Sequence, residues 1–296
     1  MSGPLDYGTL SGLIGARTQA DCACPVCGPG RSSPRTQQAR KLRLWRLGEC
    51  AISYNCVRCN LAGFATAANS RPLSESERRR MEQMFAEARR RSEAERRRNR
   101  EKAASLWRQT IDSAHTWADT YLRMRGIALP GESYLRRRTL RFHPHCPRPD
   151  LRPCPALVCA FEPILPGEPF HDAPVVAIHR IWGRGHRKAM LGAVAGCAVK
   201  ITPDERVLSR LSICEGIETG LKLLERGDPV WALASAGGIE AFPAIPRIRD
   251  LRVYADNDAS GRGLEAAKRC AGRWRQAGKR VEILMLPQEG ADYGEA

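Results

Sequence analysis

Acidic residues follow short apolar runs in the C-terminal third of the chain. The runs 211–214, 251–255 and 280–286 have the length and composition of buried strands. The acidic residues that come after them are Glu215, Glu218, Asp256, Asp258 and Asp292. Carboxylates gathered in one place repel one another unless cations bind them, and Mg²⁺, or Mn²⁺ in its place, prefers such oxygen ligands. The pattern therefore predicts a divalent-metal site suited to phosphoryl groups.

The acidic residues reach one site only if the runs belong to one sheet. A helical pattern follows each of the first two runs, and we expect a further strand at 230–234 and a turn at 237–242. Such alternation predicts an α/β fold with a parallel sheet and helices on both faces. Ligands of these sheets bind beyond the carboxyl ends of the strands. Gly261 and Gly263 follow the D-x-D pair and would let the backbone approach a phosphate.

Four cysteines near the N-terminus form two C-x-x-C pairs. They are Cys24, Cys27, Cys56 and Cys59. Two sulfurs on a tight turn can hold one side of a tetrahedral Zn²⁺, and a second pair supplies the other side. Strands expected at 42–47 and 51–55 fill the interval, and Gly28 and Gly63 suit the turns. The layout predicts a zinc ribbon, in which a closed four-sulfur site is structural rather than catalytic.

Other uses of the cysteines are less consistent with this spacing. Reduced buried cysteines do not need to be paired, and a redox role suits a lone C-x-x-C better than two pairs that flank strands. Cys22 and Cys50 are spare, and either is an alternative ligand. The chain has 12 cysteines, which in a cytoplasmic protein indicate metal binding more than a disulfide framework.

The formal net charge of +16 over 296 residues favours polyanionic partners, because neutralising phosphates releases counterions. Much of the basic charge lies in 71–102, where a capping box at 74–77 predicts the start of a helix. Pairs spaced by four residues support that helix; they are Glu87 with Arg91 and Glu93 with Arg97. The helix is either a solvated linker or a surface that follows phosphates. A second helix is expected from Thr116 to Gly126.

The segment 126–205 predicts a small β-rich unit, with strands at 156–161 and 175–182. Basic residues cluster around these strands and would line a groove for a template or a triphosphate, unless they are ordinary surface charge. They are Arg180, Arg184, Arg187, Lys188 and Lys200, with Gly261 as a further phosphate contact. His143, His145 and Cys146 lie among prolines, and we expect a loop there rather than a second metal site.

Several motifs are absent. The N-terminal residues lack the pattern of a secretory signal, and no run approaches the roughly 20 apolar residues of a membrane span, so we expect a cytoplasmic protein without membrane contact. No G-x-x-x-x-G-K-[ST] motif occurs, so a replication role would require a separate helicase. We expect four parts: a zinc ribbon (1–70), an Arg-rich helical linker (71–125), a β-rich subdomain (126–205) and a catalytic domain (206–296).

Three motifs resemble those of the Toprim domain shared by topoisomerases and primases. They are Glu215-Gly-Ile-Glu218-Thr-Gly-Leu, Ala234-Ser-Ala-Gly-Gly and Tyr254-Ala-Asp256-Asn-Asp258-Ala-Ser-Gly261. The ribbon is similar to that of bacterial and phage primases, and Tyr121-Leu-Arg-Met-Arg-Gly126-Ile resembles segments that precede Toprim domains in phage and mobile-element replication proteins. The resemblance implies Glu215 as general acid/base or metal ligand, and Asp256 and Asp258 as metal ligands. Glu218 and Asp292 would support them.

Three functions fit these motifs. The first is a primase that joins nucleoside triphosphates on single-stranded DNA during replication of a phage, plasmid or mobile element. The second is a non-catalytic protein that holds single-stranded DNA for a replication complex. The third is a Toprim nuclease, or a topoisomerase, although 296 residues leave no room for DNA-gating domains. The ribbon favours the primase.

Overall fold

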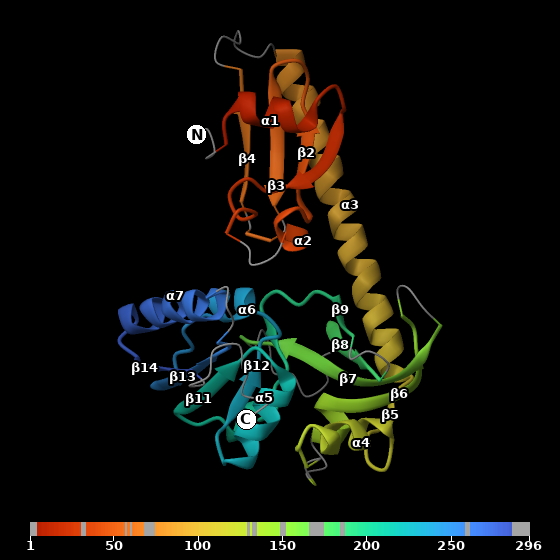
Figure 1. Ribbon diagram of the computed structural model, residues 1–296, viewed down its shortest axis with the longest axis vertical. Helices are drawn as coiled ribbons and strands as arrows, with labels where there is room; N and C mark the ends of the chain where they lie inside the picture. The colour runs from red at the N-terminus through yellow and green to blue at the C-terminus, as the bar shows by residue number, and fades with distance from the viewer. Residues whose placement is uncertain are drawn as a thin grey trace. The chain divides into compact units, whose positions relative to one another are not determined.

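The computed structural model of the chain divides into two compact units, Met1–Ser92 and Glu93–Ala296 (Figure 1). The division falls inside helix α3 (Glu75–Arg108), and each unit has its own hydrophobic core. The residues that the structure describes are 5–30, 34–56, 58–59, 61–67, 75–128, 131, 135–148, 152–165, 175–183, 187–257 and 261–285.

The first unit contains an antiparallel sheet in the order β1-β2-β3-β4. Its strands are β1 (Gln19–Ala23), β2 (Arg40–Arg46), β3 (Ala51–Cys56) and β4 (Ala62–Thr66), and its helices are α1 (Tyr7–Ile14) and the short α2 (Pro34–Gln37). The two predicted strands are confirmed as β2 and β3. Gly63 lies within β4 rather than at a turn, because it pairs with Tyr54 in the ladder.

Helix α1 closes the core of the first unit. It begins at Asp6, whose carboxylate accepts a hydrogen bond from the Thr9 backbone N–H at 2.9 Å, and it ends at Gly15, whose φ of 59° suits glycine. Leu10 and Ile14, one turn apart, are fully buried. They pack in one cluster with apolar residues of β2, β3 and β4, so the strands that carry the cysteine pairs rest on a closed core.

The predicted Arg-rich helix is confirmed as α3, although it continues to Arg108. It begins at Glu75, and Ser74, the expected cap, lies outside the described residues. Arg91 pairs with Glu87 as expected, whereas Arg97 pairs with Glu101. The next helix, α4 (Trp117–Met124), is also confirmed: the Thr116 side chain accepts from the Ala118 N–H, and Gly126 follows with φ of 69°.

The second unit contains an antiparallel sheet in the order β5-β6-β7-β8-β9, with β10 paired to β7. Its strands are β5 (Ile111–Asp112), β6 (Leu140–Cys146), β7 (Cys154–Pro163), β8 (Ala177–Trp182), β9 (Lys188–Gly192) and β10 (Cys197–Ala198), and a π-helical turn, η1 (Leu135–Thr139), precedes β6. The C-terminal end of α3 packs on one face, through Ala103, Leu106 and Trp107.

The expected loop at His143, His145 and Cys146 is wrong, since these residues belong to β6. The pairing register with β7 shifts between His143 and Cys146, where Pro144 lies. Proline donates no hydrogen bond to a ladder and is tolerated at such a bulge, so its presence misled the prediction. The two predicted strands of this region are confirmed as β7 and β8.

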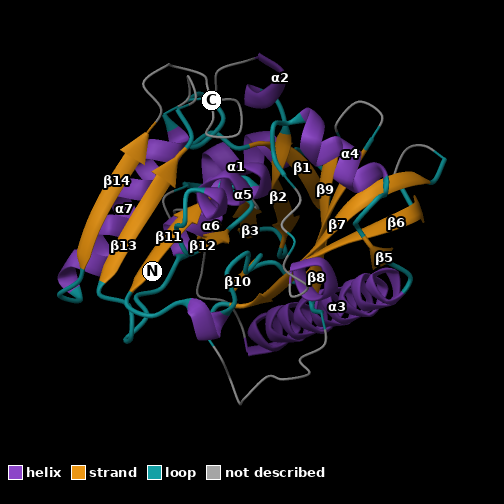
Figure 2. Ribbon diagram, turned by 90° about the horizontal axis from the view of Figure 1, so that it is seen from below, coloured by secondary structure: helices purple, strands orange, loops and turns teal. Residues whose placement is uncertain are grey.

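The C-terminal sheet is parallel throughout, in the order β12-β11-β13-β14. Its elements are β11 (Arg210–Cys214), α5 (Ile217–Glu225), β12 (Val230–Ala232), α6 (Ala236–Ala241), β13 (Asp250–Ala255), α7 (Arg262–Gln276) and β14 (Arg280–Met285), preceded by the 3-10 turn η3 (Asp204–Arg206). Helix α5 covers one face and α6 and α7 the other, which confirms the predicted fold (Figures 1 and 2). The expected turn at 237–242 is wrong: it is α6, capped by the Ser235 side chain.

The two sheets of the second unit share one core. Buried residues of α4, β6 and β7 pack in one cluster with Ile217 and Leu221 of α5 and with Val230 of β12. Val199, just after β10, exchanges two backbone hydrogen bonds with Ala232 of β12, of 2.9 and 3.0 Å. The antiparallel sheet is therefore a rigid support for the parallel one. Among the described residues, none of the helices is long and apolar enough to cross a membrane.

Candidate active site and cysteine cluster

Two predicted carboxylates lie at adjacent strand ends. Strand β11 ends at Cys214 and β13 at Ala255, and the two strands are parallel neighbours. Glu215 and Asp256 are the next residues of each, and both are half-buried. Figure 2 shows β11, β13 and β14 side by side with α7 along them. The rule that parallel strands present ligand-binding residues at one edge therefore holds for this pair.

The buried thiol of Cys214 lies in the electrostatic field of the carboxylates. Burial raises the pKa of this thiol well above its usual range, and the negative charges of Asp256, Glu215 and Glu218 raise it further. Three carboxylates thus act on a single sulfur atom: Glu215 just after β11, Glu218 in α5 and Asp256 just after β13. Half-buried oxygen donors in this arrangement fit Mg²⁺, so Glu215 and Asp256 are the described residues that would hold it. Asp258 and Asp292 lie outside the described residues.

Helix α7 begins directly against Asp256. A Cβ atom on Gly263, in the first turn, would lie 2.5 Å from the Asp256 carbonyl oxygen and 3.2 Å from its backbone nitrogen. Gly261, the residue before the helix, has φ of 63°, a conformation that glycine adopts without strain. Both glycines are thus needed by the backbone that carries Asp256, whereas a phosphate contact of Gly261 stays a prediction.

We predict that Gly263→Ala destabilises the second unit by roughly 1–3 kcal/mol, because the added methyl group meets backbone atoms that cannot move aside. Gly272→Ala is the matched control: it lies in the same helix with nothing within 4 Å of its Cβ position, and it should be neutral or stabilising by up to about 1 kcal/mol. Urea unfolding of both variants measures the difference. Equal free energies of unfolding would show that α7 does not need this close approach.

Glu218 has a different environment from Glu215 and Asp256. Its side chain is only 4% exposed, and its Oε1 accepts hydrogen bonds from the Tyr121 hydroxyl and the Lys188 Nζ, both at 2.7 Å. Burial acts to raise the pKa of Glu218, but Lys188 and Tyr121 outweigh it, so the pKa is below its usual range and the group is an anion. Sequence patterns do not show this contact, because Tyr121 and Glu218 are 97 positions apart.

The side chains of the predicted basic groove have several different environments. Arg180 is 7% exposed, lies over the Trp182 ring and donates to the Pro147 carbonyl oxygen at 3.2 Å. Lys200 is 3% exposed and pairs with Asp204 at 2.5 Å. Both side chains are buried and have protein partners, so a phosphate contact of either stays a prediction that their burial does not favour. Arg184 lies outside the described residues.

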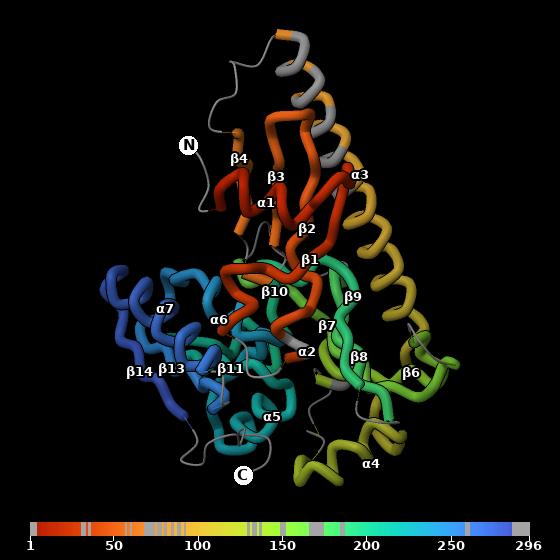
Figure 3. The backbone as a smooth tube through the Cα atoms, turned by 45° about the horizontal axis from the view of Figure 1, so that its top comes forward, coloured from red at the N-terminus to blue at the C-terminus, as the bar shows by residue number. Residues whose placement is uncertain are grey.

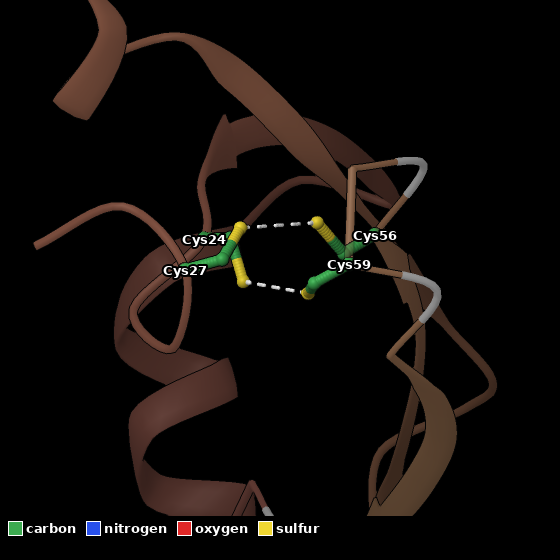
Figure 4. A group of neighbouring side chains, drawn as sticks. All are labelled: Cys24, Cys27, Cys56 and Cys59. Atoms are coloured by element: carbon green, nitrogen blue, oxygen red, sulfur yellow. Dashed lines mark hydrogen bonds between the residues drawn. The ribbon is translucent and has the colours of Figure 1, made fainter. Parts of the chain in front are cut away.

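The four predicted cysteine ligands come together in the first unit. Figure 4 shows Cys24 and Cys27 facing Cys56 and Cys59. The Cys24 and Cys59 sulfurs are 3.9 Å apart and those of Cys27 and Cys56 are 3.8 Å apart, with all four within 4.8 Å of one another. Sulfurs about 2.3 Å from a tetrahedral Zn²⁺ would be about 3.8 Å apart. The cluster therefore fits zinc.

The turn that ends at Gly28 fixes the positions of the first cysteine pair, Cys24 and Cys27. The Gly28 N–H donates to the Cys24 carbonyl oxygen at 2.8 Å, and a Cβ on Gly28 would lie 2.5 Å from that oxygen. Glycine is therefore required at this turn, as the sequence predicts. The four-sulfur cluster found among the described residues does not include Cys22 or Cys50. The structure therefore favours the two C-x-x-C pairs over these alternative ligands.

The comparisons with known proteins agree with this geometry. Residues 210–296, the parallel sheet with its acidic edge, match the family model of the Toprim domain, so the chain has a Toprim domain at its C-terminus. Toprim domains bind Mg²⁺ and occur in enzymes that process nucleic acids. Residues 97–201, which include α4 and the antiparallel sheet, match a family described only as a domain of unknown function, DUF7146. No curated protein matches the chain.

Proposed function

We propose that this protein is a primase-like nucleotidyltransferase that joins nucleoside triphosphates on single-stranded DNA. The observation that carries the proposal is the position of Glu215 and Asp256, which directly follow two adjacent parallel strands of the Toprim sheet. The cysteine cluster supports it, because a zinc ribbon followed by a Toprim domain resembles the arrangement in bacterial and phage primases. We propose Zn²⁺ at Cys24, Cys27, Cys56 and Cys59 as a structural ion.

The acidic edge would carry the chemistry. Asp256 and Glu215, with Asp258, would hold Mg²⁺ or Mn²⁺, which when bound offsets negative charge on the phosphoryl group. If Glu215 is the general base rather than a metal ligand, it would take the proton from the attacking hydroxyl group while pyrophosphate leaves from the triphosphate. The close approach of α7 at Gly263 keeps Asp256 in place. These residues therefore position the reacting groups rather than form a covalent intermediate.

Template binding would depend on basic residues other than the predicted groove. Exposed arginines line α3; among the described side chains they include Arg90, Arg91, Arg96, Arg97 and Arg98. The net charge of +16 favours a single strand on such a surface, with an affinity that falls as salt rises. A separate helicase would open the duplex, since the sequence has no P-loop.

The test is incubation with single-stranded DNA, labelled nucleoside triphosphates, and Mg²⁺ or Mn²⁺. Short template-dependent products would support the proposal. Tight binding of the template without product under any metal condition would favour a non-catalytic DNA-binding accessory instead. Metal-dependent loss of the template would favour a Toprim nuclease. Template length and binding are measured on the same preparations, so that the three outcomes are separated.

A further inference from the structure

The carboxylate of Glu218 connects the Toprim domain to the segment of unknown function. Glu218 lies in the first turn of α5, three residues after Glu215. Both donors to its Oε1 belong to residues 97–201: Tyr121 in α4 and Lys188 in β9. Figure 3 shows β9 beside β8, to which it is paired, so Lys188 extends from an ordered sheet. A residue of the acidic motif is thus held by side chains from outside the Toprim domain.

We propose that Tyr121 and Lys188 are positioning residues for the acidic edge and that Glu218 is their anchor rather than a metal ligand. This inference rests on the proposed function, because it concerns the same edge. By holding Glu218, the two donors fix the start of α5 and with it the short link back to Glu215. The segment 97–201 then has a defined role: it completes and orders the metal site of the Toprim domain.

The donors are themselves held in place. Tyr121 is 3% exposed and its ring stacks on Trp117, with centroids 5.2 Å apart, so its hydroxyl group has a fixed direction. Burial and the charge of Glu218 raise the pKa of Tyr121, so this hydroxyl is a donor at neutral pH. Helix α5 lies close to the end of the same segment, because a Cβ on Gly220 would be 2.4 Å from the Ile201 Cδ1. Packing and hydrogen bonds therefore act together on the first turn of α5.

A metal-ligand role for Glu218 would compete with these contacts. Oε1 already accepts from the Tyr121 hydroxyl and the Lys188 ammonium group, so it could bind a dication only by losing one of them, and Oε2 is the one oxygen left for a metal. A buried carboxylate that loses a charged partner is strongly destabilised. Loss of a residue that hydrogen-bonds a metal ligand typically costs about 10–100-fold in metal affinity. Glu218 would act one step further out, through the backbone that joins it to Glu215. The contacts of Glu218 match such an orienting role.

Tyr121→Phe tests the inference without changing any charge. We expect Mn²⁺ affinity, measured by electron paramagnetic resonance, to fall about tenfold. Hydrogen exchange measured by mass spectrometry should become faster in residues 215–221. Exchange elsewhere in the second unit, and the melting temperature of that unit, should stay as in the wild type. Tyr7→Phe is the control, because it also removes a tyrosine hydroxyl hydrogen bond, to the Glu49 carbonyl oxygen at 2.6 Å, but in the first unit, away from the acidic edge. It should leave both quantities as in the wild type.

Variants at the other two positions separate an anchor from a ligand. Glu218→Gln keeps an oxygen that accepts from both donors, so Mn²⁺ affinity should stay within about threefold of the wild type, whereas Glu218→Ala should lose about tenfold. Lys188→Met should weaken Mn²⁺ binding although it removes a repelling positive charge, and Lys188→Arg should restore it. Equal large losses for Glu218→Gln and Glu218→Ala, or tighter binding in Lys188→Met, would show that Glu218 is a ligand.

The two proposals fail in different ways. Absence of nucleotide transfer by the wild type, with the Mn²⁺ and exchange results as expected, would reject the primase and keep the positioning role. If the wild type binds no Mn²⁺, hydrogen exchange alone tests whether Tyr121 orders the start of α5. Unchanged exchange in residues 215–221 of Tyr121→Phe would overturn the positioning role, whatever the activity.

Discussion

Asp256→Asn should lower metal-dependent nucleotide transfer by roughly 10²–10³-fold, which corresponds to about 3–4 kcal/mol of lost transition-state stabilisation. The substitution removes one metal ligand and part of the negative potential at the edge where β11 and β13 end. Asparagine has nearly the same shape, and Asp256 is only half-buried, so the fold should be retained. Single-stranded DNA should bind as well as before or more tightly, because a repelling charge is gone. Glu215→Gln should behave in the same way.

The control for this prediction is Asp250→Asn, at the opposite end of the same strand. Asp250 forms an exposed ion pair with Arg280, so its loss should cost little stability and leave transfer unchanged. Transfer rates and DNA affinities are measured on the same preparations, with circular dichroism to verify folding. Asp256→Asn with wild-type rates would show that the chemistry lies elsewhere in the chain. A rate lost equally in Asp250→Asn would point to general damage to the sheet.

The acidic edge could be predicted because it depends on local patterns. Strand and helix periodicity placed Glu215 and Asp256 after their strands, and the geometry of parallel sheets then placed them at one edge. The cysteine cluster was predictable for a similar reason, since each C-x-x-C pair is a short turn whose shape its own spacing determines. In both cases the sequence carries the information within a few residues of the site.

The partners of Glu218 could not be predicted in this way. Tyr121 is 97 positions from Glu218, and their contact exists because α4 and α5 pack into one core. The burial of Arg180 and Lys200 could not be predicted for a related reason: the sequence shows a charge but not whether an aromatic ring covers it. Lys200 lies over the Trp231 ring at 4.7 Å, a contact that needs the folded second unit. Long-range packing therefore decided which charges serve the site.

Removal of zinc should unfold the first unit and leave the second folded. Structural Zn²⁺ contributes an apparent free energy of about 10–16 kcal/mol in small metal-dependent domains, which exceeds the total stability of most small domains. Cys24 follows β1 and Cys56 ends β3, and both strands depend on a small core of α1 and four short strands. The second unit has separate cores. A chelator, or Cys56→Ser, should therefore release about one zinc per chain and expose the first unit to protease.

Cys50→Ser is the matched control for Cys56→Ser. Cys50 is a half-buried free cysteine in the same unit and lies outside the four-sulfur cluster, so zinc content and protease resistance should remain. Elemental analysis of protein purified without added metal, together with thiol titration before and after unfolding, measures both effects. Sulfurs placed 3.8–3.9 Å apart across the cluster are spaced for one tetrahedral ion. Native protein that contains no zinc, and in which all four cluster thiols react freely, would contradict the structural ion and leave the cluster as a set of buried reduced cysteines.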